Sequence, residues 1–223
     1  HPNVNILTAE DPVEYEIGGI HQIPVSPKIG LTFASALRAF LRQDPDVIMV
    51  GEIRDKETAD IAMHASMTGH LVLSTLHTND SAGAVTRLVE MDIEPFLVRS
   101  TVIGILAQRL VRVLCPHCRV PYEATQYELE PLGIDRRRTK WRDSRKVSPR
   151  YQLPNVNYEP VGWREEGMPT FYRAAGCELC DNKGFTGRRG IHELMVVDDI
   201  VGGLVLQNAD AQTVKRAAQE SGM

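Results

Sequence analysis

At 223 residues the chain can bury one good core, with a smaller appendage beside it. Its net charge of -4 and pI near 6.0 argue against bulk nucleic-acid binding, so we expect no nucleic-acid partner. No apolar stretch reaches the ~18 residues of a membrane span, and no signal peptide precedes the first strand. Because strand-like residues start within four positions of His1, we interpret the chain as a piece of a longer polypeptide.

Residues 4–8 predict a first strand, and a group of carboxylates, Glu10, Asp11 and Glu14, follows it. Carboxylates clustered at a strand end can hold Mg²⁺ through water, or orient a water for attack. Acidic residues before a proline also make an ordinary turn, and this interpretation stays open here. Residues 16–29 predict a loop or a short hairpin, because glycines and prolines recur in them.

Thr32 predicts the N-cap of a helix that must stop before Pro45 and in which four apolar residues share one face. Arg38 and Arg42 lie four apart and so share another face. Such a pair is usually solvated surface. The alternative is that both arginines serve phosphate across a subunit boundary, since guanidinium groups suit that charge.

Residues 47–50 are apolar and stand between a Pro/Asp group and a glycine, the pattern of a short strand buried on both faces. Glu52 follows at once and would project from the carboxyl end of a central strand. Open α/β sheets place their chemistry at that end. A buried strand followed by a polar loop is the plain alternative.

Asp55 predicts the N-cap of the next helix, and residues 71–75 then repeat the buried-strand pattern. His70 precedes this strand, while Thr75 and His77 stand at its end. Three apolar runs therefore end in polar, chemically capable groups. A lone histidine is more often a satisfied hydrogen-bonding residue, but three such endings favour a shared cleft.

The second half of the chain begins with helical patterns. Residues 81–91 predict one helix, and residues 95–114 predict a longer one rich in Val, Ile and Leu. Because charged and amide side chains interrupt the longer stretch, we interpret it as a core helix and not a membrane span. A last helix is predicted over residues 211–220.

The four cysteines form two pairs with a two-residue gap, Cys115 with Cys118 and Cys177 with Cys180. Without an export signal disulfides are disfavoured, and such pairs suit tetrahedral thiolate ligation of Zn²⁺. Four unrelated buried thiols are the alternative. Gly184, after the second pair, can take the backbone conformation that a metal knuckle requires.

Residues 126–170 predict an exposed loop with a strongly basic run around Trp141. A charge run of this kind is usually solvated surface. The alternative is a contact with anionic phospholipid headgroups, where each basic residue contributes about 1 kcal/mol.

Three long motifs follow one another in the chain: LTAEDPVEY, GLTFASALRAFLRQDPDVIMVGEIRD and GHLVLSTLHTNDSAGAVTRL. They resemble the secretion ATPase superfamily, nearest the type II secretion ATPases (general secretion pathway protein E) and the type IV pilus assembly ATPases. The resemblance implies an α/β fold, with a RecA-like P-loop NTPase core and a mostly parallel sheet over residues 1–114. It implies a small zinc-binding tetracysteine module over 115–186 and a C-terminal helical segment packing on the core over 187–223.

The resemblance assigns roles to the first two motifs. The acidic stretch resembles the family's Asp box, in which Glu10 would position the attacking water, with Asp11 and Glu14 in the nucleotide-binding set. The strand before Glu52 resembles the Walker B segment, although it lacks the usual Asp before the Glu. Glu52 would act there through Mg²⁺ and water.

The third motif resembles the family's His box, in which His77 would sense the γ-phosphate, with His70 and Thr75 in the nucleotide-binding set. Arg38 and Arg42 match family arginines that approach the nucleotide of the neighbouring subunit. One motif is absent, the G-x-x-x-x-G-K-[ST] loop that cradles the phosphates and that precedes the Asp box in the family.

The resemblance implies a homohexamer that uses ATP and Mg²⁺, carries Zn²⁺, and drives protein export by type II secretion through pseudopilus assembly. Type IV pilus assembly is the alternative, as is a zinc-stabilised interaction module without catalysis for this fragment alone. The implied partners are inner-membrane platform proteins, and the implied location is cytoplasmic, peripheral to the inner membrane. Without the phosphate-binding loop we expect residues 1–223 alone to be inactive, with the first strand exposed at a sheet edge.

Overall fold

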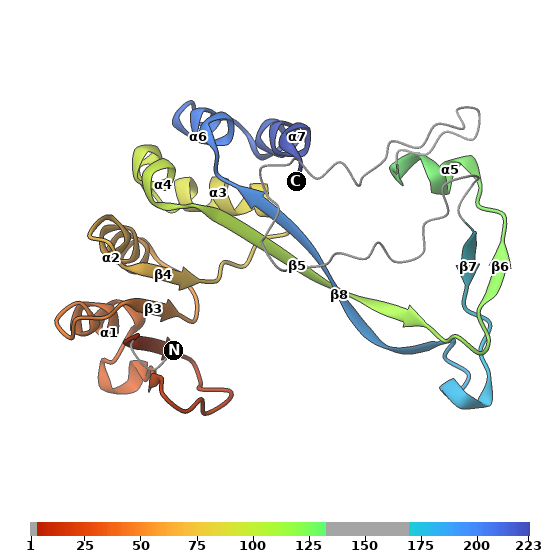
Figure 1. Cartoon of the computed structure of the whole chain (residues 1–223), viewed down its shortest axis with the longest axis horizontal. Coiled ribbons are helices and arrows are strands. Elements are labelled where there is room, and N and C mark those ends of the chain that lie inside the picture. Colours follow the sequence, from red (N-terminus) through yellow and green to blue (C-terminus); the bar gives the residue numbers. More distant parts are fainter. Residues whose placement is uncertain (1–3, 133–169) are drawn as a thin grey trace. The chain divides into compact units, whose positions relative to one another are not determined.

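The computed structural model describes residues 4–132 and 170–223 (Figure 1). They form two compact units, one made by residues up to 107 with 193–221 and Met223, the other by residues between 108 and 192 with Gly222. Within the described residues no helix is long and apolar enough to cross a membrane. The basic run around Trp141, with its predicted phospholipid contact, lies outside the described residues. The expected domain boundaries at 114/115 and 186/187 stay predictions.

The first unit is built on a four-stranded sheet of parallel strands in the order β2-β1-β3-β4. Its strands are β1 (Ile6–Glu10), β2 (His21–Pro24), β3 (Val47–Val50) and β4 (Leu71–Ser74). Leu7 pairs with Ile48, and Ile48 with Val72. Leu7 and Ile48 are almost completely buried, so the inner strands carry the core, as their unbroken apolar runs predict. The predicted α/β fold with a parallel sheet is confirmed.

Strand β2 corrects the prediction of a loop or hairpin over residues 16–29. It pairs in parallel with β1, so β1 lies between β2 and β3 and is not the exposed edge. Strand β2 has only four residues and ends in Pro24, so a local pattern does not predict it. The same region also holds η1 (Pro27–Ile29).

Strand β4 corrects the prediction that residues 71–75 are buried on both faces. Leu71 and Leu73 are 46% and 50% exposed, and within the described residues β4 pairs with β3 alone. An apolar run indicates a strand but does not say whether both of its edges are paired.

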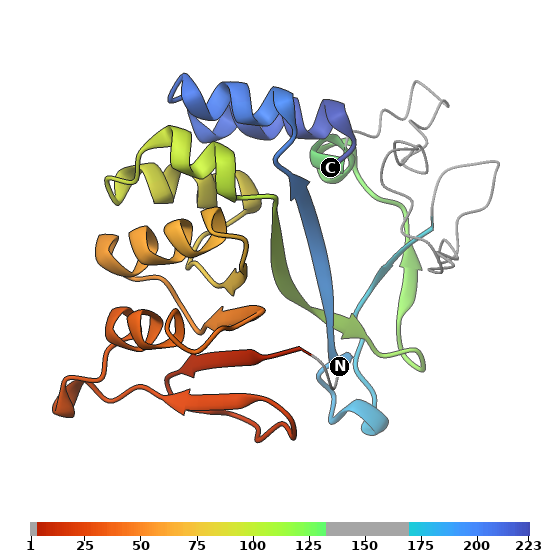
Figure 2. The same cartoon turned by 60° about the vertical axis from the view of Figure 1, so that its left-hand side comes forward.

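Helices of the first unit pack in successive tiers beside the sheet (Figure 2). Those between the sheet strands are α1 (Phe33–Phe40) and α2 (Lys56–Met67), followed by α3 (Ser81–Glu90) and α4 (Pro95–Thr101). The predicted caps at Thr32 and Asp55 are confirmed, since each side chain accepts a backbone N–H three residues later. Asp80 caps α3 in the same way, accepting from Gly83.

The predicted long helix over residues 95–114 is wrong in its second part. Helix α4 ends at Thr101, and β5 (Gly104–Leu114) follows, so Cys115 closes a strand and not a helix. Strand β5 pairs with β8 (Phe185–Val196). Val102 and Ile103 are β-branched and favour extended backbone, Gly104 weakens a helix, and pairing with the distant β8 stabilises the strand.

The chain returns to the first unit after β8 with α6 (Asp199–Leu206) and α7 (Ala211–Ser221). Helix α6 packs on α4, and α7 packs on both α3 and α6. Val201 and Val214 are fully buried in this packing. The last predicted helix is confirmed.

In the second unit, β6 (Val120–Tyr122) pairs antiparallel with β7 (Phe171–Arg173). It also holds α5 (Gln126–Leu129), η2 (Glu130–Leu132) and η4 (Glu178–Cys180). Helix α5 and η2 occupy the start of the stretch that was predicted to be a loop. Thr125 and Glu128 form a capping box at α5, and Leu129 is fully buried, which explains why this short helix forms.

Candidate functional site

Three predicted site residues lie at the carboxyl ends of adjacent strands in the first unit. Glu10 ends β1, Glu52 follows β3 by two residues, and His77 follows β4 by three. Because these strands are parallel neighbours, their carboxyl ends meet at one edge of the sheet. Nε2 of His77 lies 3.1 Å from Oε2 of Glu52. A Cβ on Gly51 would lie 3.1 Å from the carbonyl oxygen of Ala9, so the end of β1 packs directly against the residue before Glu52.

Glu52 is only 9% exposed, and the side chains of Arg54 and His77 contact its two carboxylate oxygens. Its Oε1 forms an ion pair with the guanidinium of Arg54, and its Oε2 contacts His77. The hydrogen bond with Arg54 is the main cause that lowers the pKa of Glu52, and it outweighs the effect of burial. Glu52 is therefore an ionised carboxylate at neutral pH.

Arg54 is a site residue that the sequence reasoning missed. It lies two residues after Glu52, in the segment between β3 and α2. The hydrogen bond to Glu52 raises the pKa of Arg54, and the charge of Asp11 adds to the effect. The spacing of Glu52 and Arg54 was the available signal.

Glu10 is held by neighbours within the sheet. Its Oε1 accepts hydrogen bonds from Gln22 Nε2 at 2.9 Å and from Thr8 Oγ1 at 2.6 Å. These two bonds, the one from Gln22 first, lower the pKa of Glu10. Gln22 also donates to the carbonyl of Tyr15 and so organises the turn after Glu10. Gln22 was missed because its segment was predicted to be a loop.

The other acidic residues of the first motif follow Glu10 in the turn after β1. Asp11 and Glu14 are exposed in the turn after β1, and the Asp11–Pro12 peptide bond is cis. A backbone hydrogen bond from Glu14 contributes to the lowered pKa of Glu10. The charge of Asp11 contributes to the raised pKa of Arg54.

The structure separates the residues predicted around β4. Thr75 Oγ1 donates to the carbonyl of Gly51 at 2.7 Å, so its hydroxyl fastens the end of β4 to the end of β3. His70 precedes β4, and its Nδ1 lies 2.9 Å from the carbonyl oxygen of Ala65 in α2. The structure does not bring His70 to Glu52, because the two residues stand at opposite ends of parallel strands.

The two predicted arginines lie on and after α1. Arg38 forms an ion pair with Glu57 of α2, and the two side chains are 50% and 59% exposed. Arg42 is exposed in the turn that follows α1. Neither arginine joins the group of Glu10, Glu52 and His77 within the chain, and their role toward a neighbouring subunit stays a prediction.

The second unit brings all four cysteines together as free thiols. One sulfur from each residue lies within 4.8 Å of the others, and Cys115 and Cys180 are buried. The Sγ atoms are 4.0 Å apart for Cys115 and Cys177, 3.9 Å for Cys118 and Cys180, and 3.7 Å for Cys177 and Cys180. Tetrahedral zinc at about 2.3 Å from each sulfur requires sulfurs roughly 3.8 Å apart. The cluster therefore has the donor set and the size that fit Zn²⁺.

Backbone N–H groups around Cys180 favour the ionised form of this thiol, which is the form that binds a cation. Burial raises its pKa, but N–H groups of Cys177 and Gly184 donate to the sulfur and lower the pKa to about 7. Gly184 has a φ of +73°, and a Cβ there would lie 2.5 Å from Cβ of Ala174. The prediction that Gly184 takes a special conformation is confirmed. Burial raises the pKa of Cys177 to about 11, so a bound cation is needed to ionise this thiol at neutral pH.

A solved structure shows which class of protein this fold defines. The pilus retraction motor PilT with bound ADP is similar to the chain with a TM-score of 0.58 and 25% identity, over 97% of this chain and 45% of PilT. The Legionella pneumophila ATPase DotB shows the same fold, with a TM-score of 0.53 over 98% of this chain and 43% of DotB, at 23% identity. The chain therefore has the fold of the ATPases PilT and DotB. The chain belongs to the Type II/IV secretion system protein family, whose model matches residues 1–223.

Curated relatives agree with this family. Type II secretion system protein E of Pseudomonas aeruginosa is 50% identical over 98% of this chain, and type II secretion system ATPase E of Vibrio cholerae is 51% identical over 95%. Type IV pilus assembly ATPase PilB of Thermus thermophilus is 48% identical over the whole chain. The chain spans 38%, 36% and 22% of these three relatives. The resemblance seen in the sequence is confirmed.

Proposed function

We propose that the chain is the catalytic part of an ATPase that drives protein export by type II secretion. The observation that carries the proposal is Glu52, an ionised carboxylate held between Arg54 and His77 at the sheet edge next to Glu10. Relatives named as type II secretion proteins, at 50% and 51% identity, favour export over pilus assembly. Assembly of a type IV pilus is the second candidate, since PilB relatives are 48% and 46% identical.

Each residue of the site has a proposed part in hydrolysis. Glu10 accepts hydrogen bonds that fix its carboxylate, and it orients the attacking water. Glu52 attracts Mg²⁺, because ionised carboxylates are the oxygen ligands this cation prefers. Bound Mg²⁺ would supply charge that neutralises the phosphate oxygens. His77 contacts the γ-phosphate, while Arg54 keeps Glu52 ionised and fixes its direction.

The chain itself lacks a phosphate-binding loop of the form G-x-x-x-x-G-K-[ST]. Since it spans little more than a third of the secretion relatives, we propose that a longer protein supplies this loop. In that protein Arg38 and Arg42 reach the nucleotide of a neighbouring subunit in a homohexamer. Residues 1–223 alone are then inactive, and within the fragment the zinc cluster acts as a structural support.

Further proposals follow from the same assignment. The four cysteines hold one Zn²⁺ that stabilises the second unit. The longer protein works at the cytoplasmic side of the inner membrane, with platform proteins of the secretion machine as partners. In the family that the sequence resembles, a tetracysteine site is typical of secretion and pilus assembly ATPases rather than of retraction motors, so the cluster supports export or assembly over retraction.

The proposal is tested with the longer protein that contains this chain. Purified with Mg²⁺, it should hydrolyse ATP, and a strain that lacks its gene should fail to release its exported proteins into the medium. A deletion strain that exports normally but has lost its surface pili would favour pilus assembly over secretion as the function. A longer protein without ATP turnover would contradict both candidates.

A further inference from the structure

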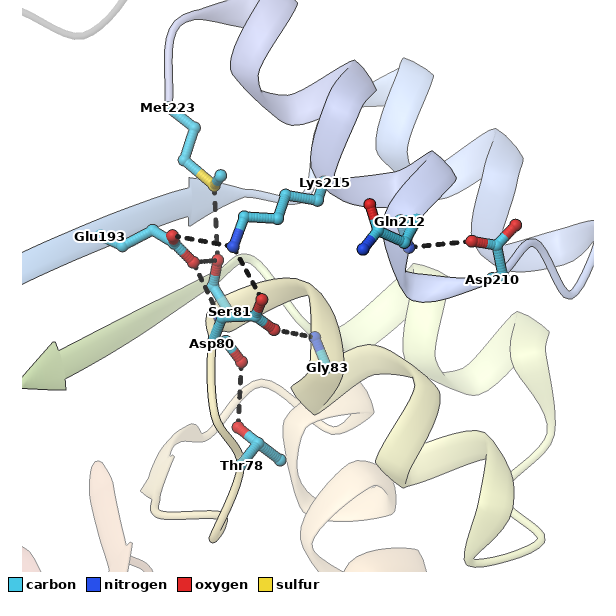
Figure 3. Close-up of polar contacts among 9 residues, drawn as sticks. All are labelled: Thr78, Asp80, Ser81, Gly83, Glu193, Asp210, Gln212, Lys215 and Met223. Atoms are coloured by element: carbon cyan, nitrogen blue, oxygen red, sulfur yellow. Dashed lines mark hydrogen bonds and ion pairs between the residues drawn. The ribbon is translucent and has the colours of Figure 1, made fainter. Parts of the chain in front are cut away.

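A second polar cluster lies in the first unit, around the start of α3 (Figure 3). Ser81, the first residue of α3, is completely buried. Its backbone N–H donates to Oε1 of Glu193 at 2.9 Å, and its hydroxyl donates to the same oxygen. Glu193 belongs to β8 and stands 112 residues further along the chain. One carboxylate oxygen therefore fixes both donors of Ser81.

Lys215 of α7 completes the cluster. Its Nζ lies 2.8 Å from Oδ2 of Asp80 and 3.8 Å from Oε2 of Glu193. The other oxygen of Asp80 accepts the N–H of Gly83, which is the N-cap bond of α3. Lys215, Asp80 and Glu193 are each about one-third exposed, so this ion-pair network is partly shielded from water. Its hydrogen bond to Asp80 is the main cause that raises the pKa of Lys215.

The loop between β4 and α3 is thereby fastened at both ends. At the β4 end, Thr75 Oγ1 donates to the carbonyl of Gly51 in the segment after β3. At the α3 end, Glu193 and Lys215 hold Ser81 and Asp80, and no sheet pairing is involved. His77 lies between the two attachments.

His77 depends on its backbone for its place. Its side chain is 85% exposed, whereas the Glu52 side chain it contacts is 12% exposed. Few packed neighbours hold the ring of such an exposed residue, so the loop that carries His77 determines whether Nε2 stays 3.1 Å from Glu52. The attachment at α3, through Asp80 and Ser81, is three and four residues from His77 in sequence.

We infer that Glu193 and Lys215 are positioning residues, which hold the start of α3 and so keep His77 over Glu52. They touch neither of these two residues and act through Ser81 and Asp80. Through them α7 and the end of β8 control the geometry of the candidate site. The consequence for turnover depends on the proposed function, whereas the consequence for the place of His77 does not.

The experiment follows the His77 ring by NMR in the 223-residue chain, with Glu52→Gln as the reference for a ring without its carboxylate partner. Lys215→Gln should shift the Nε2 and Cε1 resonances of His77 at least halfway to that reference, and Lys215→Arg should restore them. The matched control is Lys56→Gln, which removes the lysine of an exposed ion pair with Asp92 and should leave the His77 ring unchanged.

A network that only stabilises the fold would lower the melting temperature without moving the His77 resonances. An unchanged His77 spectrum in folded Lys215→Gln would therefore overturn the inference. Glu193→Gln is the second variant and should shift His77 in the same direction. If it fails to fold, as judged from its amide spectrum, Lys215→Gln alone decides, because its partly exposed side chain tolerates replacement.

The longer protein gives a second readout. There Lys215→Gln should lower kcat for ATP on the order of 10-fold with KM unchanged, since misplacing a catalytic group affects the chemical step. A shifted His77 ring with unchanged kcat would support the positioning role but contradict the proposed role of His77. A longer protein without any turnover would contradict the proposed function, while the NMR result would still decide the inference.

Discussion

Nε2 of His77 lies 3.1 Å from Oε2 of Glu52, although 25 residues separate them in the chain. The contact joins the ends of β3 and β4, and Arg54 approaches the other oxygen of the same carboxylate. Glu52 is thus fixed from two sides at the edge of the sheet where α/β proteins bind ligands. The following predictions depend on this arrangement and on the cysteine cluster of the second unit.

Replacing Arg54 by alanine should raise the pKa of Glu52, because the guanidinium is the main group that lowers it below 4.5. A group with a lowered pKa contributes stability that is present above its unfolded-state pKa and is lost as the pH falls through its folded-state pKa. The variant should therefore lose less stability than the wild type as the pH falls below 4.5. A ¹³C NMR titration of the Glu52 carboxyl carbon measures the pKa directly. Arg87→Ala, which breaks an exposed ion pair, should leave it unchanged.

An unmoved Glu52 titration in Arg54→Ala would mean that the ion pair has no part in keeping this carboxylate ionised. His77→Ala should produce a smaller rise, since its hydrogen bond ranks below that of Arg54 among the causes of the lowered pKa. Comparing the rise in the Glu52 pKa between Arg54→Ala and His77→Ala therefore checks independently which side chain lowers this pKa more.

Gly184→Ala should destabilise the second unit by about 2–5 kcal/mol, because the new Cβ meets Ala174 and the backbone φ is positive. Gly187→Ala is a matched control. Gly187 also has a positive φ, of +71°, but no atom lies near its added Cβ, so it should cost only about 1 kcal/mol. Denaturant unfolding of both variants measures the difference. Equal stabilities would contradict the close packing of Gly184 against Ala174.

Protein purified without chelator should contain one zinc per chain by elemental analysis, and Cys180→Ser should remove most of it. Loss of zinc should destabilise the second unit by on the order of 10 kcal/mol, as in small zinc modules. His117→Ala serves as the control, because His117 lies between two of the cysteines but outside the four-sulfur cluster. Absence of zinc, with the same melting profile in chelator, would leave four unrelated thiols as the better interpretation.

Residues 1–223 alone should neither bind ATP tightly nor hydrolyse it. A triphosphate needs N–H groups at a helix start and a lysine that reaches its β- and γ-phosphates, and the sequence has no such loop. Titration of labelled ATP with and without Mg²⁺ measures this for the chain and for the longer protein. Micromolar affinity of the chain alone would place the phosphate site elsewhere in the fold.

Local patterns predicted most of the first unit. The apolar run of β3, the caps at Thr32 and Asp55, and the residues that follow each strand needed no knowledge of distant contacts. Consequently the sheet edge with Glu10, Glu52 and His77 could be expected from the order of motifs. The two cysteine pairs likewise predicted the four-sulfur cluster, because the two-residue spacing within each pair can be seen in the sequence.

The errors occurred where a distant partner decides the structure. Strand β5 forms against β8, which begins about 70 residues after β5 ends, so its apolar residues looked helical. Gln22 reaches Glu10 only because β2 adds to the sheet, and Glu193 reaches Ser81 across 112 residues. No pattern within a short window indicates such contacts.

The most direct test of the account is the turnover of Glu52→Gln in the longer protein. Glutamine keeps the shape of the side chain but removes the charge that organises metal and water, so ATP binding should persist while turnover falls ~10²–10⁴-fold. Glu90→Gln, the same exchange at an exposed residue of α3, should retain wild-type turnover. Turnover of Glu52→Gln within a few-fold of the wild type would contradict the account and make Glu10 the better candidate for the catalytic carboxylate.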